Sequence, residues 1–271
     1  MTNVGCAAWS LPKSRLPGTL PDGMMMHVGI QTLSQMRMLK ECHVANEQKL
    51  RQCLGCSDGR QKISAIGLNL VEKFGLNSSA GTKFRTEFFQ FCLHVVHAAE
   101  FLDVPVVYIP SFNKNEIVGA DDLAETATFF KELCQAAQRH PVLIASENSL
   151  SAEKQLALVR QVGEPSFRVL LDIFNPLRWG HSVEEIISSV HPYLLSQVHV
   201  KDGVLPGYDN ALLGQGEGNV AAVIERIEQL GFCETYILEN DYSKLSIEGM
   251  SADISFLRSC ISGTQGKCQR M

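Results

Sequence analysis

The sequence has no long apolar run, no export signal and no excess of positive charge. No apolar stretch reaches the roughly 18 residues that a membrane-spanning helix needs. The N-terminus lacks the basic stretch and apolar core of a secretory signal. The net charge is −5 and the pI about 5.9, which argues against a nucleic-acid-binding surface. We therefore expect a cytoplasmic protein that binds neither membranes nor nucleic acids.

The chain also lacks a disulfide framework, linkers and repeats. Nine cysteines, an odd number, are scattered along the 271 residues, which is typical of reduced cytosolic thiols. Cys53 and Cys56 form one Cys-x-x-Cys near the end of an expected helix, and without a second pair they give little support to a zinc or redox site. Hydrophobic residues make up 45% of the chain and charged residues 20%, enough for a sizeable core. We expect a single domain over residues 1–271.

Short apolar runs alternate with amphipathic stretches along the chain. Over Thr86–Phe101 apolar residues recur at the three-and-four spacing of a helix with one buried face. Eight strands that alternate with helices within about 250 residues are typical of a (β/α)8 TIM barrel. A doubly wound open sheet is the alternative, but no glycine-rich phosphate fingerprint follows the first strand. The expected strands are Val4–Ser10, His27–Leu33, Ile63–Leu70, Val104–Ile109, Val142–Glu147, Val169–Asp172, Gln197–Lys201 and Thr235–Glu239.

The first βα unit of this barrel is irregular. Residues 11–26 read LPKSRLPGTLPDGMMM and contain three prolines and two glycines, which disrupt a full helix. We expect a loop over the barrel mouth in this segment. The alternative is that the first two strands begin elsewhere in the sequence.

Four of the later strands end in residues that can bind a metal ion, namely Glu147, Asp172, His199 and Glu239. The C-terminal ends of barrel strands form the active-site face, and consecutive strands are neighbours, so the four side chains can converge. A lone acidic residue at a strand end is often a helix cap. Buried carboxylates that lie together repel each other unless a cation or a proton compensates them. Three carboxylates and one imidazole favour one divalent ion such as Mn²⁺, Mg²⁺ or Co²⁺, and Zn²⁺ less so.

Three further residues near these strand ends are candidate substrate contacts. Lys201 shares a strand face with His199, so it can bind a substrate hydroxyl, carboxylate or phosphate, or pair with Asp202 or another acid. Arg178 is a second candidate anion contact, with a solvated loop position as the alternative. Trp9, at the end of the first expected strand, could stack against a sugar ring, although packing inside the barrel is the favoured interpretation.

The motifs around these residues resemble a known family. "ASEN", "LLDIFN", "VHVKD", "LGQGEGNV" and the final "LEN" resemble the sugar phosphate isomerase/epimerase family. These are the xylose-isomerase-like TIM barrels that include ketose 3-epimerases and inosose isomerases and dehydratases. The similarity is best from about Phe84 to Asn240 and weak before Ile63.

The resemblance also implies a site and a reaction. It implies a sugar, sugar phosphate or inosose substrate and proton abstraction next to a carbonyl through a metal-stabilised enediolate, with Glu147 and Glu239 as the catalytic acid–base pair. Epimerisation, aldose–ketose isomerisation and dehydration stay open as outcomes. Many relatives have a histidine that touches substrate three residues after the aspartate, and Asn175 stands at that position here. The implied metal ligands are Glu147, Asp172, His199 and Glu239.

Two other functions share this fold. Endonuclease IV-type DNA repair enzymes bind three zinc ions through extra histidines on earlier strands. Here the corresponding strand ends read "GLNLVEKFG" and "YIPSFNKN", without histidine, and the chain is acidic. A non-catalytic carbohydrate-binding barrel would need the metal ligands lost or rearranged, and all four are present. We therefore expect a metal-dependent sugar or polyol epimerase/isomerase, either monomeric or homo-oligomeric.

Overall fold

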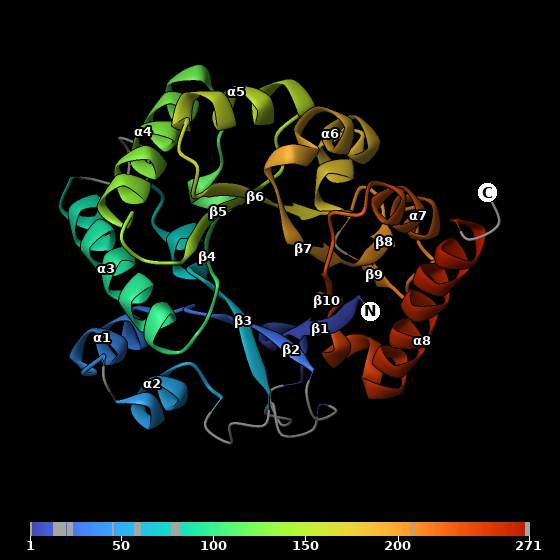
Figure 1. Ribbon diagram of the computed structural model, residues 1–271, viewed down its shortest axis with the longest axis horizontal. Helices are drawn as coiled ribbons and strands as arrows, with labels where there is room; N and C mark the ends of the chain where they lie inside the picture. The colour runs from blue at the N-terminus through green and yellow to red at the C-terminus, as the bar shows by residue number, and fades with distance from the viewer. Residues whose placement is uncertain are drawn as a thin grey trace.

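Eight parallel strands close into a barrel that helices surround (Figure 1). The computed structural model describes residues 2–12, 20, 24–44, 46–56, 61–76, 82–207 and 209–268. Around the barrel the strand order is β1, β10, β7, β6, β5, β4, β3, β2, which is the predicted TIM barrel in a single domain. The strands are β1 (Asn3–Ala7), β2 (Met25–Gly29), β3 (Lys62–Gly67), β4 (Val106–Ser111), β5 (Leu143–Asn148), β6 (Phe167–Asp172), β7 (Leu194–Val200) and β10 (Thr235–Leu238).

The helices form the outer layer of the barrel. They are α1 (Leu33–Glu41), α2 (Glu47–Cys53), α3 (Thr82–Phe101), α4 (Ala120–Ala136), α5 (Ala152–Val162), α6 (Val183–Val190), α7 (Val220–Leu230) and α8 (Tyr242–Cys268). Ser246 interrupts α8 with a φ of 67°. None of the helices in the described part of the chain is long and apolar enough to cross a membrane. No disulfide joins the cysteines whose side chains are described.

The strands are buried on both faces because helices cover the outside and side chains fill the inside. All six residues of β4 are buried, in agreement with its nearly continuous apolar sequence. The larger apolar cluster lies between the strands and the helices. A smaller cluster comes from inward-facing side chains, and Trp9 packs against it. Its buried members are Ala65, Val106, Tyr108, Ala145, Leu170 and Leu195.

All eight predicted strands are present, although several ends differ by a few residues. The second strand ends at Gly29 rather than at Leu33, because Leu33 begins α1 and Thr32 caps that helix by accepting a hydrogen bond from Gln35 N. Trp9 lies in a 3-10 turn, Ala8–Ser10, directly after β1. The irregular first unit was predicted, but residues 13–19 and 21–23 lie outside the described residues. A loop over the barrel mouth therefore stays a prediction.

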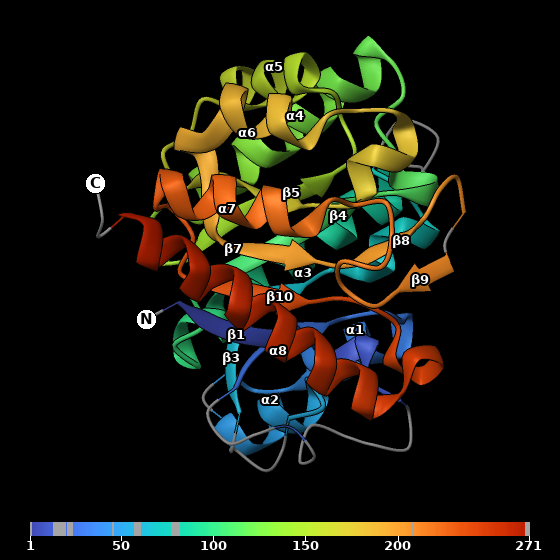
Figure 2. The same ribbon diagram turned by 90° about the vertical axis from the view of Figure 1, so that its right-hand side faces the viewer.

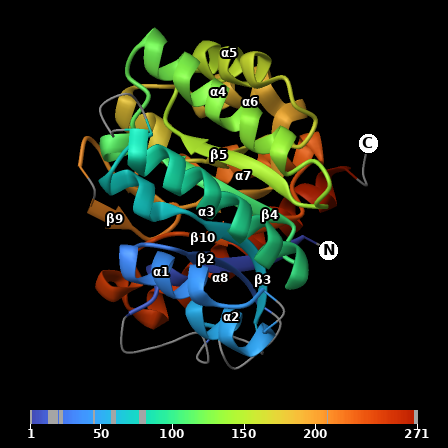
Figure 3. The same cartoon turned by 90° about the vertical axis from the view of Figure 1, so that its left-hand side faces the viewer.

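A short hairpin follows β7 at the end of the barrel opposite the N-terminus (Figures 2 and 3). It pairs β8 (Asp202–Val204) with β9 (Asp209–Ala211). The Asp202 carboxylate accepts hydrogen bonds from the backbone N–H groups of three glycines in "LGQGEGNV", at 2.9–3.0 Å. A Cβ at Gly216 would lie 2.3 Å from Asp202 Oδ1, so only glycine fits there. The carboxylate thus holds this loop at the C-terminal end of the barrel.

Candidate metal centre and active site

The four residues predicted at the strand ends meet at the C-terminal end of the barrel. Glu147 lies on β5, Asp172 ends β6, His199 lies on β7 and Glu239 directly follows β10. Asp172 and His199 are register partners across β6 and β7. One ligand-type atom from each of the four residues lies within 4.8 Å of the others. The structure therefore brings the whole predicted set together.

Backbone hydrogen bonds orient the Asp172 carboxylate. Oδ1 accepts hydrogen bonds from the N–H groups of Phe174, at 2.8 Å, and Asn175. This is the turn-forming geometry that aspartate favours, and it opens the 3-10 helix Asn175–Trp179 that follows β6. With Oδ1 held by the backbone, Oδ2 faces the other charged groups of the site.

Lys201 links two of the carboxylates. Its Nζ lies 2.9 Å from Asp172 Oδ2 and 2.7 Å from Glu239 Oε2, and its side chain is 15% exposed. The sequence predicted that Lys201 could pair with Asp202 or with another acid. The prediction of Asp202 is wrong. Adjacent strand residues point to opposite faces, and Asp202 binds the glycine-containing loop instead. Lys201 is therefore built into the acidic cluster.

His199 and Trp9 complete the contacts of the cluster. His199 Nδ1 lies 3.3 Å from Glu147 Oε1 and 3.4 Å from Glu239 Oε2. Trp9 Nε1 donates a hydrogen bond to Glu239 Oε1 at 3.1 Å. The tryptophan also packs inside the barrel, as the favoured interpretation of the sequence predicted. Its indole N–H is nevertheless a direct partner of a candidate ligand.

The cluster requires positive charge. Burial raises the pKa of Glu147 to about 7, against the lowering effect of His199. Burial also raises the pKa of Asp172, although the positive charge of Lys201 acts to lower it. Burial likewise acts to raise the pKa of Glu239, but His199 and Lys201 outweigh it and hold that pKa well below its usual range. Burial opposes a charge on His199, yet Glu239 and Glu147 raise its pKa to about 10.

The donor set fits a divalent cation. Three ionised carboxylates and one ammonium leave two negative charges when His199 is neutral, as an imidazole ligand must be. A divalent ion balances that charge, and its oxygen and nitrogen ligands are the kinds that Mn²⁺, Mg²⁺, Co²⁺ and Zn²⁺ accept. Glu147, Asp172, His199 and Glu239 are the residues that would hold it.

Two adjoining pockets open onto this cluster. They share Asn175, Arg178, Lys201 and Glu239. All four predicted substrate contacts line these pockets, because Trp9 borders the second. The first pocket is completed by Glu72, Phe112, Asn113 and Glu147, and the second by Phe174, Asn210, Asp241 and Lys244.

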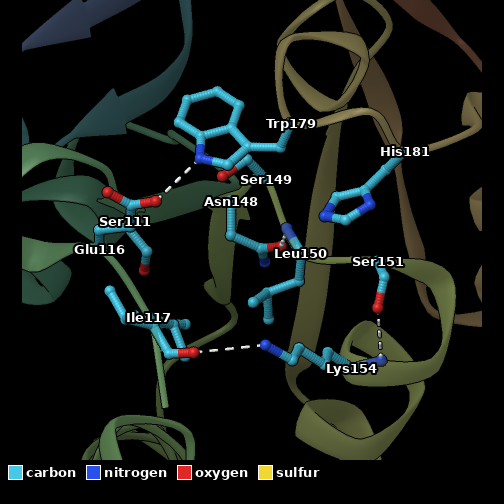
Figure 4. Close-up of a pocket in the computed structure, with 11 residues that line it drawn as sticks. Ser111, Glu116, Ile117, Asn148, Ser149, Leu150, Ser151, Lys154, Trp179 and His181 are labelled. Atoms are coloured by element: carbon cyan, nitrogen blue, oxygen red, sulfur yellow. Dashed lines mark hydrogen bonds between the residues drawn. The ribbon is translucent and has the colours of Figure 1, made fainter.

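A third pocket lies on the other side of β5, at the ends of β4 and β5 (Figure 4). Asn148 lines it, whereas the preceding Glu147 faces the acidic cluster, as alternation along a strand requires. Trp179 donates its indole N–H to Glu116 at 2.8 Å across this pocket, and the His181 ring points toward its centre. The end of β5 therefore separates this third pocket from the two that open onto the acidic cluster.

Sequence reasoning missed a buried partner of His199, His27, and the residue that bonds His27 in turn, Gln197. His27 on β2 places Nδ1 2.9 Å from His199 Nε2, and its Nε2 lies 2.6 Å from Gln197 Oε1. Burial and His199 lower the pKa of His27 to about 3, so its ring is neutral. The sequence feature that could have pointed to His27 is a histidine within an expected strand. Glu72 was also missed; it borders the first pocket and accepts a hydrogen bond from Asn113 Nδ2 at 2.7 Å.

Comparison with known proteins identifies the family. The model of the xylose isomerase-like TIM barrel family matches residues 43–260. The chain belongs to this family. The 2-epi-5-epi-valiolone 7-phosphate 2-epimerase of Actinoplanes sp. is 30% identical over 197 residues, which cover 72% of this chain and 71% of that protein. The resemblance to sugar phosphate isomerases and epimerases is confirmed.

Two solved structures illustrate how widely this fold is shared. A D-tagatose 3-epimerase-like protein superposes with a TM-score of 0.75 at 14% identity, covering 99% of this chain and 100% of that one. The IOLI protein, solved with a zinc atom, gives a TM-score of 0.72 at 16% identity, covering 97% of this chain and 99% of that one. At such identities these likenesses establish the fold alone.

Proposed function

We propose that this protein is a cytoplasmic, divalent-metal-dependent epimerase or isomerase of sugars or polyols. The observation that carries the proposal is the convergence of three carboxylates and one histidine in a xylose isomerase-like barrel, with Glu147 and Glu239 lining an adjoining pocket. The epimerase relative supports the same class of reaction. An ordinary structural role would not require three largely buried acidic side chains to bring one oxygen each within 4.8 Å of the others.

The four cluster residues would hold Mn²⁺, Mg²⁺, Co²⁺ or Zn²⁺. When bound, the ion supplies a Lewis acid that stabilises negative charge on the carbonyl and adjacent hydroxyl oxygens of the substrate. Lys201 adds a fixed positive charge beside the same carboxylates, at 2.7–2.9 Å. The site is thus suited to a reaction that develops negative charge next to a carbonyl group.

Glu147 and Glu239 would move the proton. One carboxylate removes it from the carbon beside the carbonyl, and the other returns it. Both residues line the first pocket and contact His199 from different strands, β5 and the end of β10. Delivery to the opposite face of the carbon gives an epimer, whereas delivery to the neighbouring carbon gives an aldose–ketose pair. If the substrate instead loses hydroxide after the proton is removed, the reaction is a dehydration.

The substrate is proposed to be a sugar or cyclitol ketone, with or without a phosphate group. The second pocket extends from the cluster and offers Arg178 and Lys244 as cations together with Asn175 and Asn210 as hydrogen-bonding amides. Trp9 borders the same pocket and supplies an aromatic surface. A phosphorylated substrate is supported by the named substrate of the Actinoplanes relative.

Solvent exchange tests this proposal before the product is known. Ketoses, inososes and their phosphates are incubated with the protein in D₂O and followed by NMR, after chelation and after metal add-back. We expect exchange at one carbon beside the carbonyl that requires metal. Tight binding without exchange at any carbon would establish a binding protein, and elimination of water would establish the dehydratase.

A matched variant separates the proposed bases from other pocket carboxylates. Glu147→Gln and Glu239→Gln retain a carbonyl ligand but cannot accept a proton. Glu116→Gln makes the same change in the third pocket, where the carboxylate binds Trp179. Exchange that survives in Glu116→Gln and falls in the other two supports the assignment. Unchanged inversion in both proposed base variants would contradict it.

A further inference from the structure

A line of buried polar side chains crosses the interior of the barrel beneath the acidic cluster. Gln197 Nε2 donates to the backbone carbonyl of Ser64 at 3.1 Å, and Gln197 Oε1 lies 2.6 Å from His27 Nε2. His27 Nδ1 then lies 2.9 Å from His199 Nε2. β2 and β7 are separated by β1 and β10 in the barrel, so these contacts are made across its interior. Both imidazole rings are completely buried.

The glutamine end of this line places one proton. A backbone carbonyl only accepts hydrogen bonds, so the atom of Gln197 that faces Ser64 is the amide nitrogen. The amide oxygen therefore faces His27, and His27 Nε2 must carry the proton that it accepts. In a neutral ring the other nitrogen, Nδ1, then presents a lone pair to His199.

The cluster end leads to the same arrangement. His199 Nδ1 is the ring nitrogen that faces the carboxylates of Glu147 and Glu239, at 3.3 and 3.4 Å. A histidine that binds a metal through Nδ1 needs a lone pair there and carries its proton on Nε2. That Nε2–H points at the lone pair on His27 Nδ1. The contacts of Gln197 and those of the carboxylates therefore require the same arrangement, in which His27 and His199 each carry one proton, on Nε2.

We propose that His27 and Gln197 are positioning residues that hold His199 in the Nε2–H tautomer, with its Nδ1 lone pair facing the metal site. This inference rests on the proposed function, in which His199 is a metal ligand. Hydrogen bonding of the second ring nitrogen fixes both the tautomer and the ring orientation of ligand histidines. Tyr108 and Trp9 pack against the His199 ring, at centroid distances of 5.8 and 6.3 Å, and further restrict it.

Zinc affinity tests the role of His27 without an activity assay. His27→Leu removes the acceptor for His199 Nε2–H, and the Zn²⁺ affinity, measured by competition with a chromophoric chelator, is expected to fall about 10–100-fold. His27→Asn retains an amide oxygen near the position of Nδ1 and should recover most of that loss. His94→Leu is the matched control, because it removes a part-buried histidine that bonds the Leu39 carbonyl far along the chain from the ligands.

The tautomer itself can be observed by ¹⁵N NMR of the zinc-loaded protein with labelled histidines. The His199 signal, identified by its loss in His199→Gln, is expected to show a protonated Nε2 and a metal-bound Nδ1. Gln197→Met leaves both imidazoles in place and should weaken Zn²⁺ binding in the same direction as His27→Leu. It provides the comparison if His27→Leu does not fold.

The outcomes separate this inference from the function on which it rests. Wild-type protein that binds no Zn²⁺, Mn²⁺ or Co²⁺ would overturn both. Wild-type protein that binds Zn²⁺, together with His27 and Gln197 variants of equal affinity, would overturn only the positioning role. A His199 that carries its proton on Nδ1 in the zinc-loaded protein would do the same.

Discussion

Removal of the ammonium group that links two buried carboxylates should destabilise the metal-free protein. In Lys201→Met the side chain keeps its approximate length, but its positive charge is lost. The Asp172 side chain is completely buried and that of Glu239 is 10% exposed, and each lies within 3 Å of Lys201 Nζ. The variant therefore leaves buried negative charge without its nearest cation.

The magnitude follows from burial. Breaking a buried ion pair by removing one partner costs about 3–5 kcal/mol. Because Lys201 itself is 15% exposed, we expect the lower end of that range, about 3 kcal/mol. For a chain of this size, a melting temperature falls about 2–4 °C per kcal/mol, so the expected decrease is about 6–12 °C.

Thermal unfolding with a chelator and with saturating Mn²⁺ provides the assay. The loss should shrink when Mn²⁺ is present, because a divalent ion binds the folded state and compensates the same carboxylates. Lys40→Met is the matched control, since Lys40 pairs with Glu87 at 3.0 Å on the surface and should contribute less than about 1 kcal/mol. Equal small losses in both variants, or a loss that Mn²⁺ does not change, would refute the argument.

Four further substitutions test the site. Glu147→Gln and Glu239→Gln should each lose about 10²–10⁴-fold in turnover, since general acid–base groups contribute that much, and in D₂O the two variants should retain exchange of opposite substrate epimers. His199→Ala should lower metal occupancy measured by elemental analysis; normal occupancy would show that His199 is not a ligand. Trp9→Phe keeps an aromatic ring but removes the donor to Glu239, so kcat/KM should fall about tenfold with an unchanged circular dichroism spectrum.

The barrel is well predicted from the sequence because each strand is marked by a local pattern of residues. Each strand is a short apolar run between turns, and both faces of a barrel strand are covered. Strand ends are less well predicted, since capping and 3-10 turns decide them. Ile63–Leu70, for example, was expected to be one strand, but it ends at Gly67 and the 3-10 helix Asn69–Lys73 follows.

The candidate ligands were predictable for a related reason. A ligand at the end of a strand is marked by its position in the sequence, and neighbouring strands bring such positions together. His27 and Gln197 carry no such mark, because they meet across the barrel from strands that are not adjacent. The partners of Lys201 were not predicted for the same reason. They are Asp172 and Glu239, which lie on other strands, rather than the next residue along the chain.

Two residues that contact the candidate ligands come from a part of the chain that precedes all four ligands. Residues 43–260, which match the family model, contain all four candidate ligands. Trp9 and His27 precede that region, yet Trp9 binds Glu239 and His27 binds His199. Two of the four candidate ligands, which lie in the matched segment, therefore contact side chains outside it. Substitutions at Trp9 and His27 should therefore alter how the proposed metal centre is held while its four candidate ligands stay the same.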